Sequence, residues 1–149
     1  MPHLLLKPTF DSFSFIEGEL TTFNKFTFNG YIQKEFFEEA PEKEFSDWKD
    51  LREICFSLIK GKRTPLGFKF VLSLNPKHFE KFIESNSVEG FQPENIKGLY
   101  LNFKYDGTNL QCVTGTSLTI FTLDKSLENA WDEYVKKLFS KMEIEWDTI

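Results

Sequence analysis

The residue types best suited to chemistry come together in one short stretch, the cations Lys60, Lys62 and Arg63 around Gly61. Lysine and arginine bind phosphate through charged hydrogen bonds, so this cluster could hold a phosphate group. Phosphate sites prefer helix N-termini or glycine-rich loops, however, and GKRTP lacks the GxxxxGK[ST] spacing of a P-loop. The cluster instead follows a predicted helix over 47–60, whose C-terminal carbonyl groups are stabilised by cations. The sequence therefore favours a structural role at the end of this helix, with Gly61 as its left-handed terminal residue.

A basic strip that binds nucleic acid or a phosphate-containing ligand is the alternative function for these cations. Proteins that bind single strands combine such strips with aromatic rings, which Phe68 and His78 could supply here. A net charge of −5 repels nucleic acid at long range, although a local basic face can outweigh that total. The sequence therefore ranks this function second. Its candidate ligand-binding residues are Lys60, Lys62, Arg63 and Lys69, extended by Lys77 and Lys81.

The other reactive residue types are scattered along the chain. Eight carboxylates lie between Glu35 and Glu53 around Pro41, but they do not follow the spacing of a calcium-binding loop and are expected to be solvated. His78 has no second histidine nearby to form a triad or a metal site. Ser117, in TGTS, lacks the GxSxG sequence that surrounds a nucleophilic serine. We therefore predict no catalytic residue, no metal site and no cofactor, and favour a protein that is not an enzyme.

The composition indicates the class of protein. The chain has 149 residues, so we expect a single domain over 1–149, and its 18 phenylalanines indicate an aromatic core or an aromatic partner surface. No apolar run reaches the ~18 residues that cross a bilayer, and the N-terminal apolar patch is too short for a signal peptide. Cys55 and Cys112 form no CxxC motif and are expected to be buried thiols of a reducing compartment. These features predict a cytoplasmic protein.

Binding is the function that these observations favour. An excess of phenylalanine without a group of acid and base residues is typical of an interaction module rather than an enzyme. We therefore predict a non-catalytic cytoplasmic module that binds a protein partner or a second copy of itself, through an aromatic surface or a sheet edge. Nucleic acid is the less favoured partner, and no membrane partner is expected.

The spacing of apolar residues predicts the strands. Period-two alternation indicates two strands within 12–33, joined near 22–25, and one strand over 67–74. The segment 98–123 alternates on both sides of a strong hairpin signal and is interrupted again at Gly115. We therefore expect a three-stranded antiparallel meander over 98–123.

Three segments show the apolar spacing of amphipathic helices, and each has a polar residue suited to cap its N-terminus. The last of these segments has a wide apolar stripe that must pack against other residues. The predicted helices and caps are 47–60 with Ser46, 76–85 with Asn75, and 126–143 with Ser126. Antiparallel strands with separate helices indicate the α+β class. We therefore expect an antiparallel sheet with three helices packed on one face.

Two stretches resemble a family of uncharacterised cytoplasmic proteins from Firmicutes, namely FSLIKGKRTPLGFKF (56–70) and GLYLNFKYDGTNLQCVTGTSLTIFTLDKSLENAWDEYVKKLF (98–139). This resemblance covers most of the chain and implies no activity, because none is assigned to the family. The order of elements over 67–123 is also similar to one β-α-β-β-β unit of a DNA sliding clamp. That likeness implies a fold only, since the helix predicted over 76–85 mixes lysines with glutamates and presents no basic face to DNA.

Overall fold

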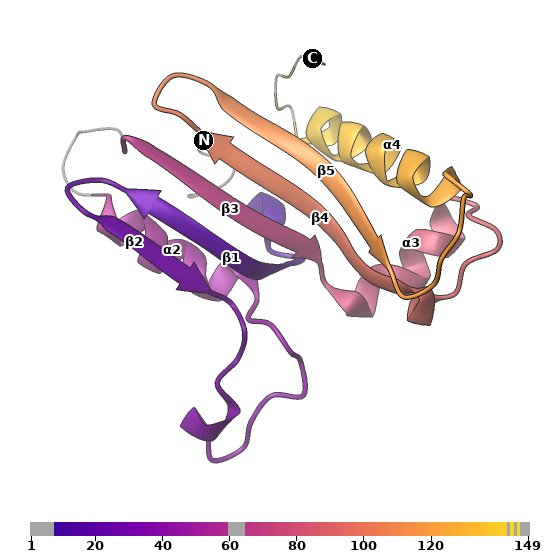
Figure 1. The fold of residues 1–149 in the computed structure, drawn as a ribbon, viewed down its shortest axis with the longest axis horizontal. Coiled ribbons are helices and arrows are strands. Elements are labelled where there is room, and N and C mark those ends of the chain that lie inside the picture. Colours follow the sequence, from indigo (N-terminus) through magenta and orange to yellow (C-terminus); the bar gives the residue numbers. More distant parts are fainter. Residues whose placement is uncertain (1–7, 60–64, 143, 145, 147–149) are drawn as a thin grey trace. The chain divides into compact units, whose positions relative to one another are not determined.

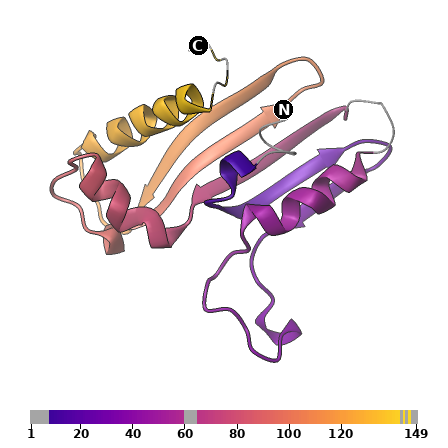
Figure 2. The same cartoon turned by 180° about the vertical axis from the view of Figure 1, so that it is seen from behind.

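The structure is a computed structural model that describes residues 8–59, 65–142, 144 and 146. The described residues form a five-stranded antiparallel sheet with the strand order β2-β1-β3-β4-β5 (Figure 1, and from behind in Figure 2). The strands are β1 (Phe13–Thr21), β2 (Lys25–Asn29), β3 (Gly67–Leu74), β4 (Ile96–Tyr105) and β5 (Leu110–Leu118). The α-helices are α2 (Trp48–Leu58), α3 (Phe79–Ser85) and α4 (Ser126–Lys141), and the 3₁₀-helices are η1 (Pro8–Phe10), η2 (Lys34–Phe36), η3 (Pro76–His78) and η4 (Pro93–Asn95). The predicted α+β class, with an antiparallel sheet and three helices, is confirmed.

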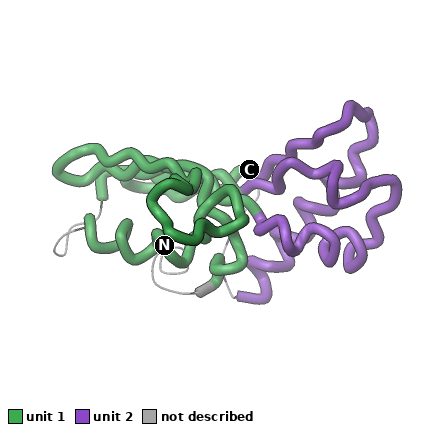
Figure 3. The backbone as a smooth tube through the Cα atoms, turned by 90° about the horizontal axis from the view of Figure 1, so that it is seen from below, with its two compact units in different colours: residues 1–73, 101–113 green, residues 74–100, 114–149 purple. Residues whose placement is uncertain are grey.

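The chain divides into two compact units, and strands β3, β4 and β5 contribute residues to both (Figure 3). Unit 1 consists of residues 1–73 and 101–113, and unit 2 consists of residues 74–100 and 114–149. Each unit has helices of its own, because α2 belongs to unit 1 whereas α3 and α4 belong to unit 2. The expectation of a single domain over 1–149 stays a prediction.

Aromatic rings build the core of unit 1. Trp48, the first residue of α2, packs against Phe15 of β1 and Phe70 of β3, with ring centroids 5.5 Å and 5.3 Å apart. All three side chains are fully buried. Because each ring of this kind removes roughly 150–250 Å² of surface from water, the cluster holds α2 against the sheet. Part of the high phenylalanine content is therefore explained by this aromatic core.

The hairpin of β1 and β2 has the predicted form. The two strands pair antiparallel from Glu17 opposite Asn29 to Thr21 opposite Lys25. A tight turn joins them, in which the Thr22 backbone N–H donates to the Asn24 carbonyl oxygen at 2.9 Å. The two strands expected within 12–33 are therefore confirmed.

The N-terminus of α2 differs from its prediction. Asp47 and not Ser46 occupies the N-cap position, and the Asp47 side chain makes no capping hydrogen bond. Ser46 instead takes part in a backbone ladder, since its N–H donates to the Gly30 carbonyl at 2.9 Å and its carbonyl accepts from the Phe15 N–H at 2.8 Å. Sheet-like pairing of Ser46 therefore replaces the expected cap.

The C-terminus of α2 comes earlier than predicted. The helix ends at Leu58, and Ile59 already has an extended backbone. The remainder of the predicted last turn, with Lys60 and Gly61, lies outside the described residues. The role of the cation cluster in ending the helix therefore stays a prediction.

An aromatic cluster joins the helices of unit 2. Leu127, Trp131 and Val135 of α4 are buried, as its apolar stripe predicted. The Trp131 ring stacks on Tyr134 with centroids 5.3 Å apart, and the Phe82 ring of α3 meets both of them edge-on. Helices α3 and α4 therefore pack together within unit 2.

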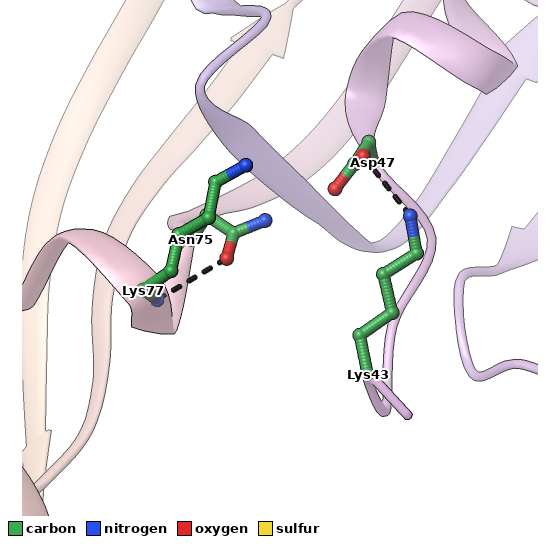
Figure 4. Close-up of polar contacts among 4 residues, drawn as sticks. All are labelled: Lys43, Asp47, Asn75 and Lys77. Carbon is green, nitrogen blue, oxygen red and sulfur yellow. Dashed lines mark hydrogen bonds and ion pairs between the residues drawn. The ribbon is translucent and has the colours of Figure 1, made fainter. Parts of the chain in front are cut away.

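The segment predicted as a helix over 76–85 begins with the expected cap. The Asn75 Oδ1 atom accepts a hydrogen bond from the Lys77 backbone N–H at 3.3 Å, and Pro76 lies in the first turn (Figure 4). That first turn is η3, which continues directly into α3. The predicted extent and the predicted cap are therefore correct.

The prediction of a third strand within 98–123 is wrong. Strand β5 passes through Gly115 without a break, and residues 119–125 contain no strand. The Thr119 backbone N–H donates to the Asn95 carbonyl at 2.8 Å, so the last backbone hydrogen bond between strands β4 and β5 joins the residue after β5 to the residue before β4. From β3 onward the order is therefore β-α-β-β, one strand short of a sliding-clamp unit.

The prediction that Ser126 caps α4 is also wrong. Ser126 is the first residue of the helix, and its backbone N–H donates to the Asp124 carboxylate at 2.9 Å. This hydrogen bond lowers the pKa of the Asp124 carboxyl group. Asp124 therefore supplies the acceptor that we expected from the Ser126 hydroxyl.

Candidate functional site

The predicted ligand-binding cluster is only partly described. Lys60, Lys62 and Arg63 lie outside the described residues. Lys69 is exposed on β3, where its neighbours in sequence, Phe68 and Phe70, are buried. Binding of nucleic acid or phosphate through this cluster therefore stays a prediction.

The scattered candidates for catalysis, His78 and Ser117, both belong to unit 2. His78 is half-buried in η3, and burial lowers the pKa of its ring, as do the charges of Lys77 and Lys81. Ser117 is half-buried in β5. Within the described residues no hydrogen bond joins these two side chains, so they do not form a nucleophile and base pair.

The described part of the chain contains no group of three histidine, cysteine or acidic side chains that could hold a metal ion. Its two cysteines are free thiols, with Cys55 buried and Cys112 half-buried. Burial raises the pKa of each thiol to about 12. Both are therefore poor nucleophiles at neutral pH, because the reactive species is the thiolate.

The segment between β2 and α2, residues 30–46, is the candidate functional site of unit 1. It leaves the end of β2, projects away from the strands of unit 1, and returns to the start of α2 (Figures 1 and 2). Long excursions of this kind are uncommon in compact proteins and are often functional. We call residues 30–46 the aromatic arm.

Backbone hydrogen bonds close the base of the aromatic arm. The Ser46 N–H donates to the Gly30 carbonyl, and the Ile32 N–H donates to the Glu44 carbonyl, both at 2.9 Å. The Phe15 N–H donates to the Ser46 carbonyl at 2.8 Å, which links the base to β1. The two ends of the arm are thus held side by side.

Side-chain packing also fixes the base. Tyr31 and Phe45 face each other in an isolated β-bridge, and their rings meet edge-on with centroids 6.0 Å apart. Gly30 approaches β1 so closely that a Cβ atom there would lie 1.8 Å from the Phe15 carbonyl oxygen. Only glycine fits at this position. Ring packing between Tyr31 and Phe45 and the close approach of Gly30 to Phe15 therefore both hold the base of the arm in place.

The tip of the aromatic arm is a single 3₁₀ turn, η2. The Phe36 N–H donates to the Gln33 carbonyl at 3.0 Å, and the Phe37 N–H donates to the Lys34 carbonyl at 3.2 Å. The Lys34 Nζ atom donates to the Pro41 carbonyl oxygen at 2.6 Å, which ties the two sides of the tip together. The tip is thus ordered although η2 buries no side chain.

Two phenylalanine rings are exposed at this tip. The Phe36 side chain is 85% exposed and the Phe37 side chain is 43% exposed. The rings contact each other edge-on, with centroids 5.4 Å apart. Sequence reasoning missed both residues because they follow neither helical nor strand periodicity. The signal that could have found them is an adjacent phenylalanine pair inside a run of glutamates, FFEEAPEKE.

Acidic residues flank these rings in the sequence. Residues 33–44 contain five glutamates and two lysines, which gives the segment a net charge of −3. Lys43 Nζ pairs with the Asp47 carboxylate at 3.0 Å (Figure 4). Among the described residues, none of the five glutamates forms an ion pair. Their carboxylates are exposed to solvent, as the sequence predicted.

A second exposed apolar segment, residues 119–124, belongs to unit 2. Phe121 is 91% exposed and Leu123 is 82% exposed. The segment is held at its first residue, where the Thr119 hydroxyl donates to the Glu94 carbonyl at 3.0 Å. No run of like charges flanks Phe121 and Leu123, so nothing in this segment indicates the chemistry of a partner.

The fold and the arm together define an α+β protein with an ordered, exposed aromatic projection. Residues 3–147 match the family of unknown function DUF5721, and the chain belongs to that family. This match confirms the expected membership of a family without an assigned activity. No curated protein and no solved structure matches the chain. None of the helices in the described part of the chain has the length and apolar character needed to pass through a bilayer.

Proposed function

We propose that this protein is a non-catalytic module of the cytoplasm that binds a protein partner through the aromatic arm, with Phe36 as the main contact. The observation that carries the proposal is the 85% exposure of the Phe36 ring on an arm that hydrogen bonds hold at its base and tip. An exposed phenylalanine forgoes roughly 1.5–3 kcal/mol that burial would provide. A partner that covers the ring recovers this free energy.

The order of the arm favours binding over incidental exposure. A side chain on a disordered loop loses conformational entropy when a partner fixes it, which weakens binding. Here the Gly30–Ser46 and Ile32–Glu44 hydrogen bonds fix the base, and the Lys34–Pro41 hydrogen bond fixes the tip. The arm therefore presents Phe36 and its neighbour in one geometry before the partner arrives.

The two free thiols support the cytoplasmic location. Cys55 and Cys112 are both unpaired, and proteins of oxidising compartments commonly pair their cysteines. Their burial protects them from modification, since the pKa of each thiol is raised to about 12. A reducing compartment fits this arrangement.

Photo-crosslinking tests the proposed contact. The photoreactive amino acid p-benzoylphenylalanine replaces Phe36 in one variant and Phe23 in a matched control, and both proteins are produced in the cells that normally contain them. Phe23 is 65% exposed and belongs to the same unit, but it lies in the turn between β1 and β2. We expect illumination to join a defined protein to position 36 and not to position 23.

Two results would contradict the proposed function. No crosslinked protein at position 36 would show that the arm has no partner. Equal crosslinking from positions 36 and 23 would show that the captured proteins meet any exposed aromatic residue. Circular dichroism of both variants confirms that the replacements leave the fold intact.

A further inference from the structure

We infer that the partner site for the aromatic arm is an apolar pocket rimmed by lysine or arginine side chains of another protein. This inference rests on the proposed function and adds the chemistry of the partner. It follows from how charge is arranged around the Phe36 and Phe37 rings at the tip.

Carboxylates lie next to both rings in the sequence. Glu35 precedes Phe36, and Glu38 and Glu39 follow Phe37. All three glutamates are exposed, and none of them forms an ion pair within the described residues. A pocket that buried the two rings would therefore bring its own rim close to three unneutralised carboxylates. Cations on that rim complement them, whereas acidic groups would repel them.

The lysines of the arm are already engaged. The Lys34 ammonium group donates a hydrogen bond to the Pro41 carbonyl at 2.6 Å. Lys43 pairs with the Asp47 carboxylate at 3.0 Å, near the base. These two lysines make contacts within the arm or at its base, while the glutamate carboxylates stay exposed to solvent without an ion pair to any described residue. The partner therefore meets a surface that is apolar at the rings and negative around them.

Charge also distinguishes this partner from the other occupants. A second copy of the chain in a two-fold contact would place one acidic tip against another, in a protein whose net charge is −5. Nucleic acids and anionic lipid surfaces are negative as well and are repelled by the same carboxylates. A protein with a cationic rim around an apolar pocket is the occupant that satisfies both features of the tip.

The two features act on different rate constants. Charges at the rim of an interface mainly change the association rate constant and its dependence on salt. Burial of an aromatic ring mainly sets the dissociation rate constant. Neutralising the carboxylates should therefore slow association and leave dissociation nearly unchanged, while truncating Phe36 should speed dissociation.

The experiment uses the protein captured by photo-crosslinking at position 36, identified by mass spectrometry and purified without the crosslink. Stopped-flow measurements give its association rate constant with the full chain between 50 and 300 mM NaCl. The arm variant combines Glu35→Gln, Glu38→Gln and Glu39→Gln. The matched control combines Glu80→Gln, Glu84→Gln and Glu89→Gln, which removes the same charge from exposed positions in unit 2.

We expect the association rate constant of the native chain to fall about tenfold over this salt range, as electrostatic steering requires. The arm variant should associate several-fold more slowly at 50 mM NaCl and lose most of the salt dependence, while the control variant should retain both. Equal behaviour of the two variants would overturn the inference and leave the proposed function standing. Capture of a second copy of the chain would overturn it too, whereas the absence of any captured protein would overturn the proposed function itself.

Discussion

The indole Nε1–H of Trp131 donates a hydrogen bond to the backbone carbonyl of Tyr100 at 3.0 Å, which joins α4 to β4 within unit 2. Trp131 is fully buried, so a substitution that removes the indole N–H leaves the Tyr100 carbonyl without a donor where water cannot easily replace it. Trp131→Phe should therefore lower the free energy of unfolding by about 2–3 kcal/mol, from the lost hydrogen bond and the lost ring volume. Urea denaturation followed by circular dichroism measures this change.

Trp146→Phe is the matched control for this substitution. The Trp146 side chain is 41% exposed, so its replacement should change the free energy of unfolding by no more than about 0.5 kcal/mol. Similar losses in the two variants would show that the Trp131 hydrogen bond does not stabilise unit 2.

Local features of the fold could be predicted from the sequence, and features that depend on distant residues could not. The Asn75 cap and the stripe around Trp131 follow from neighbouring residues and from helical spacing. The end of β5 at Leu118 was not predicted, because Leu118, Ile120 and Thr122 alternate as in a strand although β5 has already ended there. Ser46 likewise fails to cap α2 because its backbone pairs with Gly30.

The candidate site was harder to predict than the fold. Exposure of a phenylalanine is a tertiary property, and the Phe36-Phe37 pair belongs to no helical or strand period. The acidic loop itself was predicted to be solvated, which is correct, but the two rings inside it were not recognised. The cations chosen from the sequence carry obvious chemistry, yet Lys69 is the only one of the four that lies in the described part of the chain.

The thiols of buried Cys55 and half-buried Cys112 should resist modification in the folded protein. The pKa of both Cys55 and Cys112 is raised to about 12 by burial, so almost no thiolate exists at pH 8. The thiol reagent DTNB should therefore react slowly with the native protein and rapidly in urea. Absorbance at the wavelength of the released thiolate measures both rates. Rapid reaction of both thiols in the native state would contradict their burial.

The same thiols should make the protein less stable at alkaline pH. An unperturbed thiol has a pKa of 9.0, against about 12 in the folded protein. Between these values the folded state keeps a proton that the unfolded state has lost, so the free energy of unfolding falls as pH rises. Below about pH 8 both states are protonated and the thiols add no pH dependence. The Cys55→Ala, Cys112→Ala variant should show a shallower decline from pH 9 to 11 than the native chain, and an identical decline would contradict the raised pKa values.

The Gly30 position tests the base of the aromatic arm. A Cβ atom would lie 1.8 Å from the Phe15 carbonyl oxygen, so Gly30→Ala forces the backbone of the arm away from β1. We expect a loss of more than about 3 kcal/mol in the free energy of unfolding, as for other severe backbone clashes. Urea denaturation measures the loss.

Gly90→Ala provides a comparison in which backbone strain alone, without a steric clash, lowers the free energy of unfolding. Gly90 has φ +84, and a Cβ atom at this position would have no neighbouring atom within 4 Å, so alanine there meets strain but no clash. Its cost should be about 1–2 kcal/mol, the usual penalty of a left-handed conformation. If Gly30→Ala costs no more than Gly90→Ala, the close approach to Phe15 does not restrict this position.

Replacing the outer part of the arm should separate binding from stability. The Ile32–Glu44 hydrogen bond holds the two sides together, so an Asn-Gly dipeptide in place of residues 33–43 would form a two-residue hairpin turn. Residues 33–43 are exposed except for the half-buried Pro41, so the core keeps its contacts, and a shorter loop lowers the entropy cost of closure by about 1 kcal/mol. The thermal midpoint should therefore stay within about 5 °C of the native value, while binding of the crosslinked partner is lost, as it is for Phe36→Ala in the full chain. A large fall in the midpoint would mean that the arm supports the fold of unit 1, and retained binding would place the partner site elsewhere.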